Sequence, residues 1–296
     1  MKATVILNVH SSRTRRELAR IPALLAAKGI EIARFRQVAG NADLKRRLKE
    51  ACKRGDQLLV VGGGDGTMTQ TANVLAHTDT ALGVLPLGTG NSFALTLGIG
   101  EDLERAVDVI AGGRVARVDL GVANGRYFAN FATIGFAAEV AESTARGLKK
   151  LVGPLAYLAA AVPALLTHRG FHARVRAKRH RLQLDAQQII VVNGRFFGNR
   201  AISAAATNTD GKLAFFTTAG VSRTEIVKTY LALGLGLHER LPEAHEFASK
   251  RFKIRTKPKQ PLNLDGDAFG TTPVRFAVAR RALRVFVPRD FVDEQT

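Results

Sequence analysis

The chain has 296 residues, of which 46% are hydrophobic, so it is long enough and apolar enough for two domains and is not disordered throughout. Lys and Arg number 44 against 25 Asp and Glu, which gives a formal net charge of +19. This excess favours a polyanionic partner, namely nucleic acid, an anionic lipid surface or an acidic substrate, although a generally basic proteome would produce the same charge. A single cysteine excludes an internal disulfide, and the lack of Trp argues against stacking platforms for single-stranded nucleic acid.

Up to about residue 120, strand-like and helix-like segments alternate along the chain. Strands are predicted at residues 4–8, 30–37, 57–61, 81–85 and 114–120. Helices are predicted at residues 15–28, 43–54, 66–77 and 101–111. Pro22 should kink the first of these helices or mark its real start, because proline cannot donate the helical hydrogen bond. This alternation predicts a doubly wound parallel sheet with helices on both faces.

Beyond residue 120 the pattern changes to short strands separated by turns. Residues 170–180 alternate strictly between apolar residues and His, Arg or Lys, which indicates a half-buried strand with a basic outer face. Further strands are predicted at residues 188–192, 212–218, 251–256, 274–279 and 283–287, with one helix at 223–237. The fold class is therefore α/β, with a parallel-sheet domain at residues 1–121 and an antiparallel β-sandwich domain at residues 122–296.

A glycine-rich turn follows the apolar run at residues 58–61. It consists of Gly62, Gly63, Gly64, Asp65, Gly66 and Thr67. Glycines let the main chain approach a ligand, and the amides at the start of the next helix favour an anion. The carboxylate of Asp65 would repel a bare phosphate, which suggests a metal ion or a basic residue between them. The turn therefore indicates a site for a metal-bound nucleotide, although an isolated glycine cluster is often only a tight turn.

A second turn of the same kind begins at residue 86. Residues 86–93 read Pro-Leu-Gly-Thr-Gly-Asn-Ser-Phe and follow the apolar run at 81–85. Two such units in succession place two phosphate-facing loops at the same edge of a parallel sheet. No Gly-Lys-Ser/Thr follows either set of glycines, so this is not a Walker A loop. The acid at Asp65 also departs from the dinucleotide-binding pattern Gly-x-Gly-x-x-Gly.

Together with residues 119–121, 130–135, 192–198, 210–213 and 264–267, these turns resemble the catalytic region of the diacylglycerol kinase and sphingosine kinase family. The resemblance is greatest to its small soluble bacterial lipid kinases and extends along nearly the whole chain. It implies an ATP- and Mg²⁺-dependent kinase that phosphorylates a primary hydroxyl of a diacylglycerol-like or long-chain-base lipid. Residues 1–121 would then bind the nucleotide and residues 122–296 the lipid, with the last strands returning to the first domain.

The resemblance also implies a cytoplasmic protein that associates peripherally with an anionic membrane surface. The longest apolar stretch, at residues 151–166, is shorter than the ~20 residues that a membrane-spanning helix needs. It matches a region of the family that could cover an acyl pocket, although an apolar stripe is more often plain core. Nucleic acid is not the expected partner, and a homodimer remains open.

On the nucleotide side, the amides of residues 62–67, the Thr67 hydroxyl and Thr89 would hold the triphosphate. Asn8 ends the first strand at the same sheet edge. In the family this strand runs into an Asn-Pro-x-Ser-Gly turn, whereas residues 8–12 here read Asn-Val-His-Ser-Ser. Both the proline and the glycine are lost, so the shape of this loop departs from the family pattern.

The resemblance implies a charge network of Arg13, Asp65 and Asp119 around the nucleotide, with Asp65 among the catalytic residues. A solvated arginine is an equally ordinary reading of Arg13, which lies close to two further arginines. A carboxylate that caps a turn is the alternative reading of Asp119.

A substrate hydroxyl needs a proton acceptor at neutral pH, and residues 264–267 read Leu-Asp-Gly-Asp. Asp265 matches the first acid of the family's Asp-Gly-Glu motif, and Asp267 replaces the glutamate with a side chain one methylene shorter. Either acid is a candidate for the proton acceptor, and we favour Asp265 over Asp267. A plain hairpin turn is the competing interpretation of the Asp-Gly pair.

Residues 210–213, Asp-Gly-Lys-Leu, are similar to a structural magnesium site of the family. Carried over, the ligands are the side chain of Asp210 and the main-chain carbonyls of Thr207 and Lys212. Oxygen ligands of this kind suit a hard cation, although Asp-Gly is equally common as a plain turn.

Two other functions remain open on the sequence. NAD kinase shares the first glycine motif, but residues 86–93 and 264–267 count against it. A non-catalytic basic binding module on an inactive kinase scaffold would explain the altered first loop and the charge of +19. The outer face of the strand at 170–180 could rest on anionic headgroups, with a simple solvated face as the alternative.

Overall fold

The computed structural model describes residues 1–147, 165–166, 168–194, 196–197, 200–201, 207–220, 222, 224, 226–228 and 244–294. The chain forms two compact units. The first comprises Met1–Leu120, Thr207–Gly211 and Ala279–Thr296, and the second comprises Gly121–Ala206 and Lys212–Val278. Two of the predicted segments, the apolar stretch at 151–166 and the helix at 223–237, lie mostly outside the described residues.

A parallel sheet forms the centre of the first unit. Its strands are β1 (Lys2–Asn8), β2 (Glu31–Val38), β3 (Leu58–Gly63), β4 (Ala81–Pro86) and the final part of β17 (Val274–Val287). They lie in the order β2–β1–β3–β4–β17, and every pair in this series is parallel. Each of β3 and β4 is buried along its whole length, which explains why both read as continuous apolar runs.

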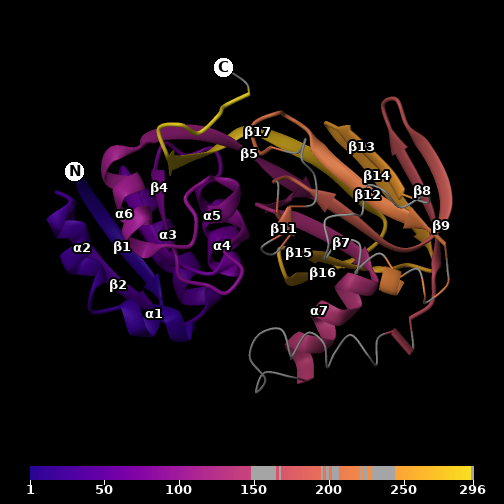
Figure 1. Cartoon of the computed structure of the whole chain (residues 1–296), viewed down its shortest axis with the longest axis horizontal. Coiled ribbons are helices and arrows are strands. Elements are labelled where there is room, and N and C mark those ends of the chain that lie inside the picture. Colours follow the sequence, from indigo (N-terminus) through magenta and orange to yellow (C-terminus); the bar gives the residue numbers. More distant parts are fainter. Residues whose placement is uncertain are drawn as a thin grey trace. The chain divides into compact units, whose positions relative to one another are not determined.

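Helices cover this sheet (Figure 1). They are α1 (Ser12–Glu17), α2 (Ile21–Ala27), α3 (Asn41–Lys53), α4 (Asp65–Leu75), α5 (Ser92–Thr96) and α6 (Leu103–Gly112). The crossovers from β1 to β2 and from β3 to β4 run in opposite directions, so their right-handedness places α2 and α4 on opposite faces. In agreement, α3 packs on α4 and α2 packs on α6. The predicted helix at 15–28 is two helices, and Pro22 lies in the first turn of the second.

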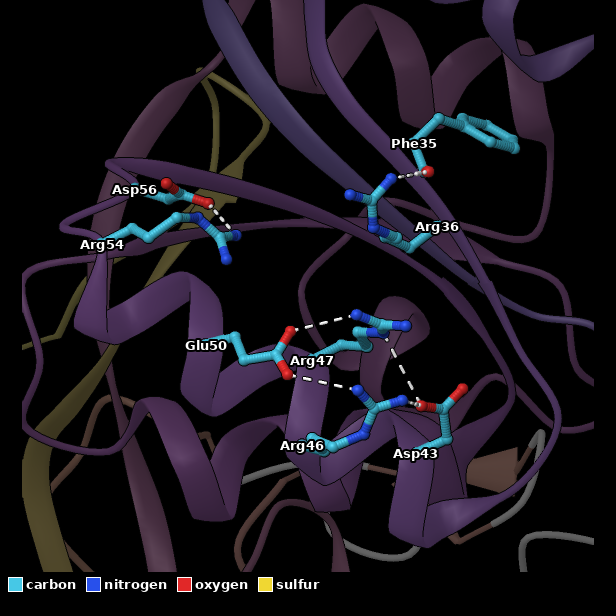
Figure 2. Close-up of polar contacts among 8 residues, drawn as sticks. All are labelled: Phe35, Arg36, Asp43, Arg46, Arg47, Glu50, Arg54 and Asp56. Carbon is cyan, nitrogen blue, oxygen red and sulfur yellow. Dashed lines mark hydrogen bonds and ion pairs between the residues drawn. The ribbon is translucent and has the colours of Figure 1, made fainter.

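The outer surface of α3 carries a chain of ion pairs, shown in Figure 2. Arg46 pairs with Asp43 and lies 3.3 Å from Glu50, which is also 3.1 Å from Arg47. Exposed pairs of this kind contribute little stability. The inner face, with Leu44 and other apolar residues buried, holds α3 on the sheet.

The second unit is built from antiparallel strands. Its main path runs β16 (Asp267–Thr271), β15 (Pro261–Leu264), β7 (Phe131–Gly135), β9 (Arg181–Val192), β8 (Phe171–Ala177), β14 (Arg251–Lys257) and β17. Further strands are β12 (Leu213–Ala219), β13 (Ala244–Ser249), β6 (Arg126–Phe128), β10 (Phe196–Phe197) and β11 (Arg200–Ala201). Strand β5 (Arg114–Ala123) begins in the first unit, and its last three residues pair with β6 in the second unit. Its one described long helix is α7 (Phe136–Gly147), which was not predicted. The predicted α/β class with an antiparallel second half is confirmed.

Aromatic residues fill the core of the second unit. The ring of Phe252 lies edge-on to Phe215, 6.1 Å away, and 5.2 Å from Phe276. The two strands predicted at 274–279 and 283–287 are in fact the single strand β17, so the prediction of a break between them was wrong. The chain passes through it with a left-handed residue, Arg281, at φ +51°. This conformation disturbs the alternation of apolar residues and makes one strand look like two.

Candidate functional site

The two glycine turns of the first unit lie at the carboxyl ends of neighbouring parallel strands, β3 and β4, and touch each other. The amide of Leu87 donates to the carbonyl of Gly63 at 3.0 Å. A Cβ atom added to Gly88 would lie 2.3 Å from the Cα atom of Gly64. Since main chain meets main chain here, both turns depend on the absence of a side chain at this contact.

The glycines of the first turn differ in what they do. Gly62 and Gly63 are the last residues of β3 and are buried. A Cβ atom on Gly62 would lie 2.6 Å from the Leu7 side chain, and one on Gly63 would lie 2.4 Å from the Thr67 hydroxyl. These two glycines are therefore required by packing. A Cβ atom on Gly66 would meet nothing within 4 Å, so the space beside this residue, in the first turn of α4, is open to a ligand.

Asp65 connects the first turn to the second. Its Oδ1 atom accepts a hydrogen bond from the amide of Phe93 at 3.1 Å, and its Oδ2 atom accepts one from the Ser92 hydroxyl at 3.4 Å. Asp65 therefore holds the start of α5. The second turn is shaped by Asn91, at φ +49°, whose side chain accepts from the Gly88 amide at 2.8 Å. Asn91 was not predicted as a site residue, although asparagine is one of the few residues that adopts this conformation readily.

The loop after β1 lies beside both turns. The side-chain amide of Asn8 donates to the Thr67 hydroxyl at 3.0 Å, and the Ser11 hydroxyl donates to the Leu87 carbonyl at 2.7 Å. The loop thus remains attached to the turns without the proline and glycine of the family pattern. Thr89, predicted to contact the triphosphate, is exposed in the second turn.

The structure does not join Arg13, Asp65 and Asp119 into one charge network. Arg13 donates to the carbonyl of Glu101 at 2.7 Å and forms no ion pair with any described residue. Asp119 is only 1% exposed. It accepts hydrogen bonds from the amides of Gly211 at 2.8 Å and Arg281 at 2.7 Å, both in the first unit. Asp119 therefore ties three separate chain segments together.

Asp265, in the second unit, is held by main-chain amides. Its Oδ2 atom accepts from Ala129 at 2.6 Å, and its Oδ1 atom accepts from Asn130 at 2.9 Å and Phe131 at 2.8 Å. The residue is 6% exposed and lies at φ +49°. These three charge-assisted bonds hold the carboxylate in one orientation.

Asp267 has different surroundings in the same unit. Its side chain is 38% exposed and lies 3.6 Å from the Arg126 guanidinium. Arg126 in turn lies over the ring of Phe269, 5.3 Å from its centroid. Asp267 is therefore accessible to solvent and oriented by one basic neighbour, a contact that the sequence spacing did not reveal.

The predicted magnesium ligands lie around a turn at residues 207–212. Gly211 adopts φ +71°, and the carbonyl of Asn208 accepts from the Asp119 amide at 2.7 Å. No group of three His, Cys, Asp or Glu side chains gathers anywhere in the described part of the chain. A cation bound at Asp210 would therefore depend on the main-chain carbonyls of Thr207 and Lys212 and on water.

Comparison with known proteins assigns both parts of the chain. Residues 2–123 match the diacylglycerol kinase catalytic domain, and residues 130–287 match the YegS C-terminal NAD kinase beta sandwich-like domain. A protein of Enterobacter sp. (strain 638) named "Probable lipid kinase YegS-like" is 31% identical, with 84% of each chain covered. Diacylglycerol kinase of Staphylococcus carnosus (strain TM300) is 28% identical, with 98% of this chain and 96% of the relative covered.

A solved structure supports the same fold. The chain superposes on a candidate diacylglycerol kinase from Bacillus anthracis str. Sterne with a TM-score of 0.81 at 23% identity, covering 98% and 96% of the two chains. These findings make the protein a lipid kinase. It belongs to the family of the diacylglycerol kinases and YegS-like lipid kinases. None of the helices in the described ranges is long and apolar enough to cross a membrane.

Proposed function

We propose that the protein transfers the γ-phosphoryl group of ATP, in the presence of Mg²⁺, to a primary hydroxyl of a diacylglycerol-like or long-chain-base lipid. The observation that carries this proposal is the contact between the two glycine turns beside the open space at Gly66. Residues 1–121 would serve the nucleotide and residues 122–296 the lipid. The protein would act in the cytoplasm and associate peripherally with membrane.

The first unit would hold the nucleotide mainly through its main chain. The first turn of α4 presents main-chain amides, and the helix dipole favours an anion beside them. The open side of Gly66 admits a phosphate close to these amides, and Thr89 would add an exposed hydroxyl. Asn8 and Thr67 bond to each other, so their expected role is to orient the loop and the helix start.

Asp267, in preference to Asp265, would accept the proton of the lipid hydroxyl. This reverses the order expected from the sequence. The three amides around Asp265 hold its carboxylate in place and suit a positioning role, whereas Asp267 is partly exposed and has one basic neighbour. In the reaction the hydroxyl oxygen bonds to the γ-phosphorus, the bond to the bridging oxygen breaks, and the hydroxyl proton passes to the Asp267 carboxylate.

Asp210, with the carbonyls of Thr207 and Lys212, would hold a structural Mg²⁺. The donors are all oxygens, which suits this ion. The cation would supply positive charge that stabilises the turn, next to the hydrogen bonds that join Asp119 to Asn208 and Gly211.

The experiment is transfer of labelled phosphate from ATP to a panel of diacylglycerols, long-chain bases and NAD. Wild type, Asp267→Asn and a surface control, Lys45→Gln on α3, are compared. We expect labelled lipid from wild type and the control, and a rate reduced roughly 100-fold or more in Asp267→Asn, the usual contribution of general-base catalysis. Label in NAD alone, or in no acceptor, would refute the proposed function.

A further inference from the structure

The outward side of the sheet in the second unit is strongly basic. Strands β8, β14 and β17 bury apolar residues such as Val175, Ile254 and Phe276 in the core and turn the intervening residues outward. We call this outward surface, together with the start of β9 and the turn before it, the basic face. It consists of Arg174, Arg176, Lys178, Arg181, Arg251, Lys253, Arg255 and Arg275.

Strand register places like charges directly opposite each other on the basic face. Arg176 pairs with Arg181 of β9 on one side and with Lys253 of β14 on the other, and Lys253 pairs with Arg275 of β17. Neighbouring strands are about 4.8 Å apart, so this row repels itself. In agreement, Arg255, burial and the other neighbouring arginines lower the pKa of Lys253 below its ordinary value.

Among the residues that the structure describes, acidic side chains do not neutralise this charge. No residue of the basic face forms an ion pair with a carboxylate in the described ranges. Asp185, the acid of β9 that faces β8, lies 3.0 Å from His172 instead. An anionic partner would therefore relieve a repulsion that no acidic side chain of the described residues compensates.

The face is also shaped to admit a ligand. An open groove of about 980 Å³ is lined by Arg176, Lys253 and Arg275, with Asn124 and Gly125 of the β5–β6 turn along it. A second groove, of about 520 Å³, shares Lys178 and Arg251 with the first and continues the positive surface.

We propose that the basic face docks the protein onto the anionic phospholipid surface of a bilayer. The proposal rests on the proposed function, because a lipid substrate resides in such a surface. A sheet face presents its cations in a plane, as a bilayer presents its headgroups, whereas the major groove of DNA admits a helix or a two-stranded ribbon. No large aromatic side chain is exposed among the described residues, which disfavours stacking on single-stranded nucleic acid.

The test measures cosedimentation with phosphatidylcholine vesicles that contain or lack phosphatidylglycerol, at low and at physiological salt. Neither ATP nor diacylglycerol is present, so binding is read independently of kinase activity. The variant combines Arg176→Gln, Lys253→Gln and Arg275→Gln. The matched control removes three exposed lysines of α3, by Lys45→Gln, Lys49→Gln and Lys53→Gln.

Wild type and the control should bind the anionic vesicles and lose binding as salt rises. The basic-face variant should bind roughly 100-fold more weakly, from the usual contribution of each basic residue near an anionic surface. Its thermal midpoint should equal or exceed that of wild type, because the change relieves repulsion.

Equal binding by variant and control would overturn the proposal, as would absence of binding by wild type. Binding to duplex DNA but not to vesicles, lost in the same variant, would replace the bilayer with nucleic acid. Vesicle binding that depends on the basic face in a protein without kinase activity would leave this inference standing and refute the proposed function alone.

Discussion

Replacing each acid of the 264–267 turn with asparagine separates a positioning carboxylate from a proton acceptor. In Asp265→Asn, the amide oxygen can accept the two hydrogen bonds now made by Oδ1, but the NH₂ group then faces the Ala129 amide, which is 2.6 Å from Oδ2. Two donors oppose each other in a site that is 6% exposed. Loss of one charge-assisted bond and desolvation of an unpaired amide predict a destabilisation of roughly 2–4 kcal/mol.

Asp267→Asn should behave differently. The side chain is 38% exposed and has one ion-pair partner at 3.6 Å, so its contribution to stability should be below about 1 kcal/mol. Its kcat should nevertheless fall by roughly 10²–10⁴ if it accepts the proton.

Urea unfolding of both variants, followed by kcat and KM at a temperature where each is folded, provides the measurement. A stable Asp265→Asn protein with a greatly reduced kcat, beside an active Asp267→Asn protein, would refute this reasoning and return the proton-acceptor role to Asp265.

Three further substitutions test other parts of the structure. Gly66→Ala should raise the free energy of unfolding by up to about 1 kcal/mol but also raise the KM for ATP, and unchanged ATP binding in this variant would count against the nucleotide site. Gly88→Ala should lower the thermal midpoint, because its Cβ atom would lie 2.3 Å from main chain. Asp119→Ala should reduce the free energy of unfolding by roughly 3 kcal/mol or more, since two buried amides lose a charged acceptor, and a wild-type urea midpoint would contradict this. Burial opposes ionisation of Asp56, but hydrogen bonds from Arg54 and Thr4 outweigh it and lower the pKa of Asp56 (Figure 2 shows the Arg54 contact). Its stabilising contribution is therefore present above pH ~4 and lost as the pH falls through the lowered pKa, so Asp56→Asn should flatten the decline of the thermal midpoint between neutral and acidic pH.

The parallel sheet of the first unit was predictable because its signals are local. Each of β3 and β4 is an apolar run that ends in glycines, and Pro22 marks a helix start through its own covalent geometry. The two glycine turns could be placed at one sheet edge for the same reason.

The contacts of the acids could not be predicted, because they depend on residues far away in the sequence. Asp265 receives its hydrogen bonds from amides more than 130 positions earlier, and Asp119 receives one from Arg281 near the end of the chain. Neither spacing nor residue type reveals such a partner. β17 was predicted as two strands because of a local feature, the left-handed conformation of Arg281. Arginine in a sequence does not indicate that conformation.

The return of β17 to the first unit has a consequence during synthesis. Residues 1–120 leave the ribosome long before residues 279–287. Until the end of β17 has been synthesised, β4 therefore lacks the strand that pairs with it on one side. The Asp119 carboxylate likewise cannot accept its two hydrogen bonds until the amides of Gly211 and Arg281 have been synthesised. The first unit should therefore be a poor candidate for expression as a fragment cut at residue 121, and its completion should follow translation of nearly the whole chain.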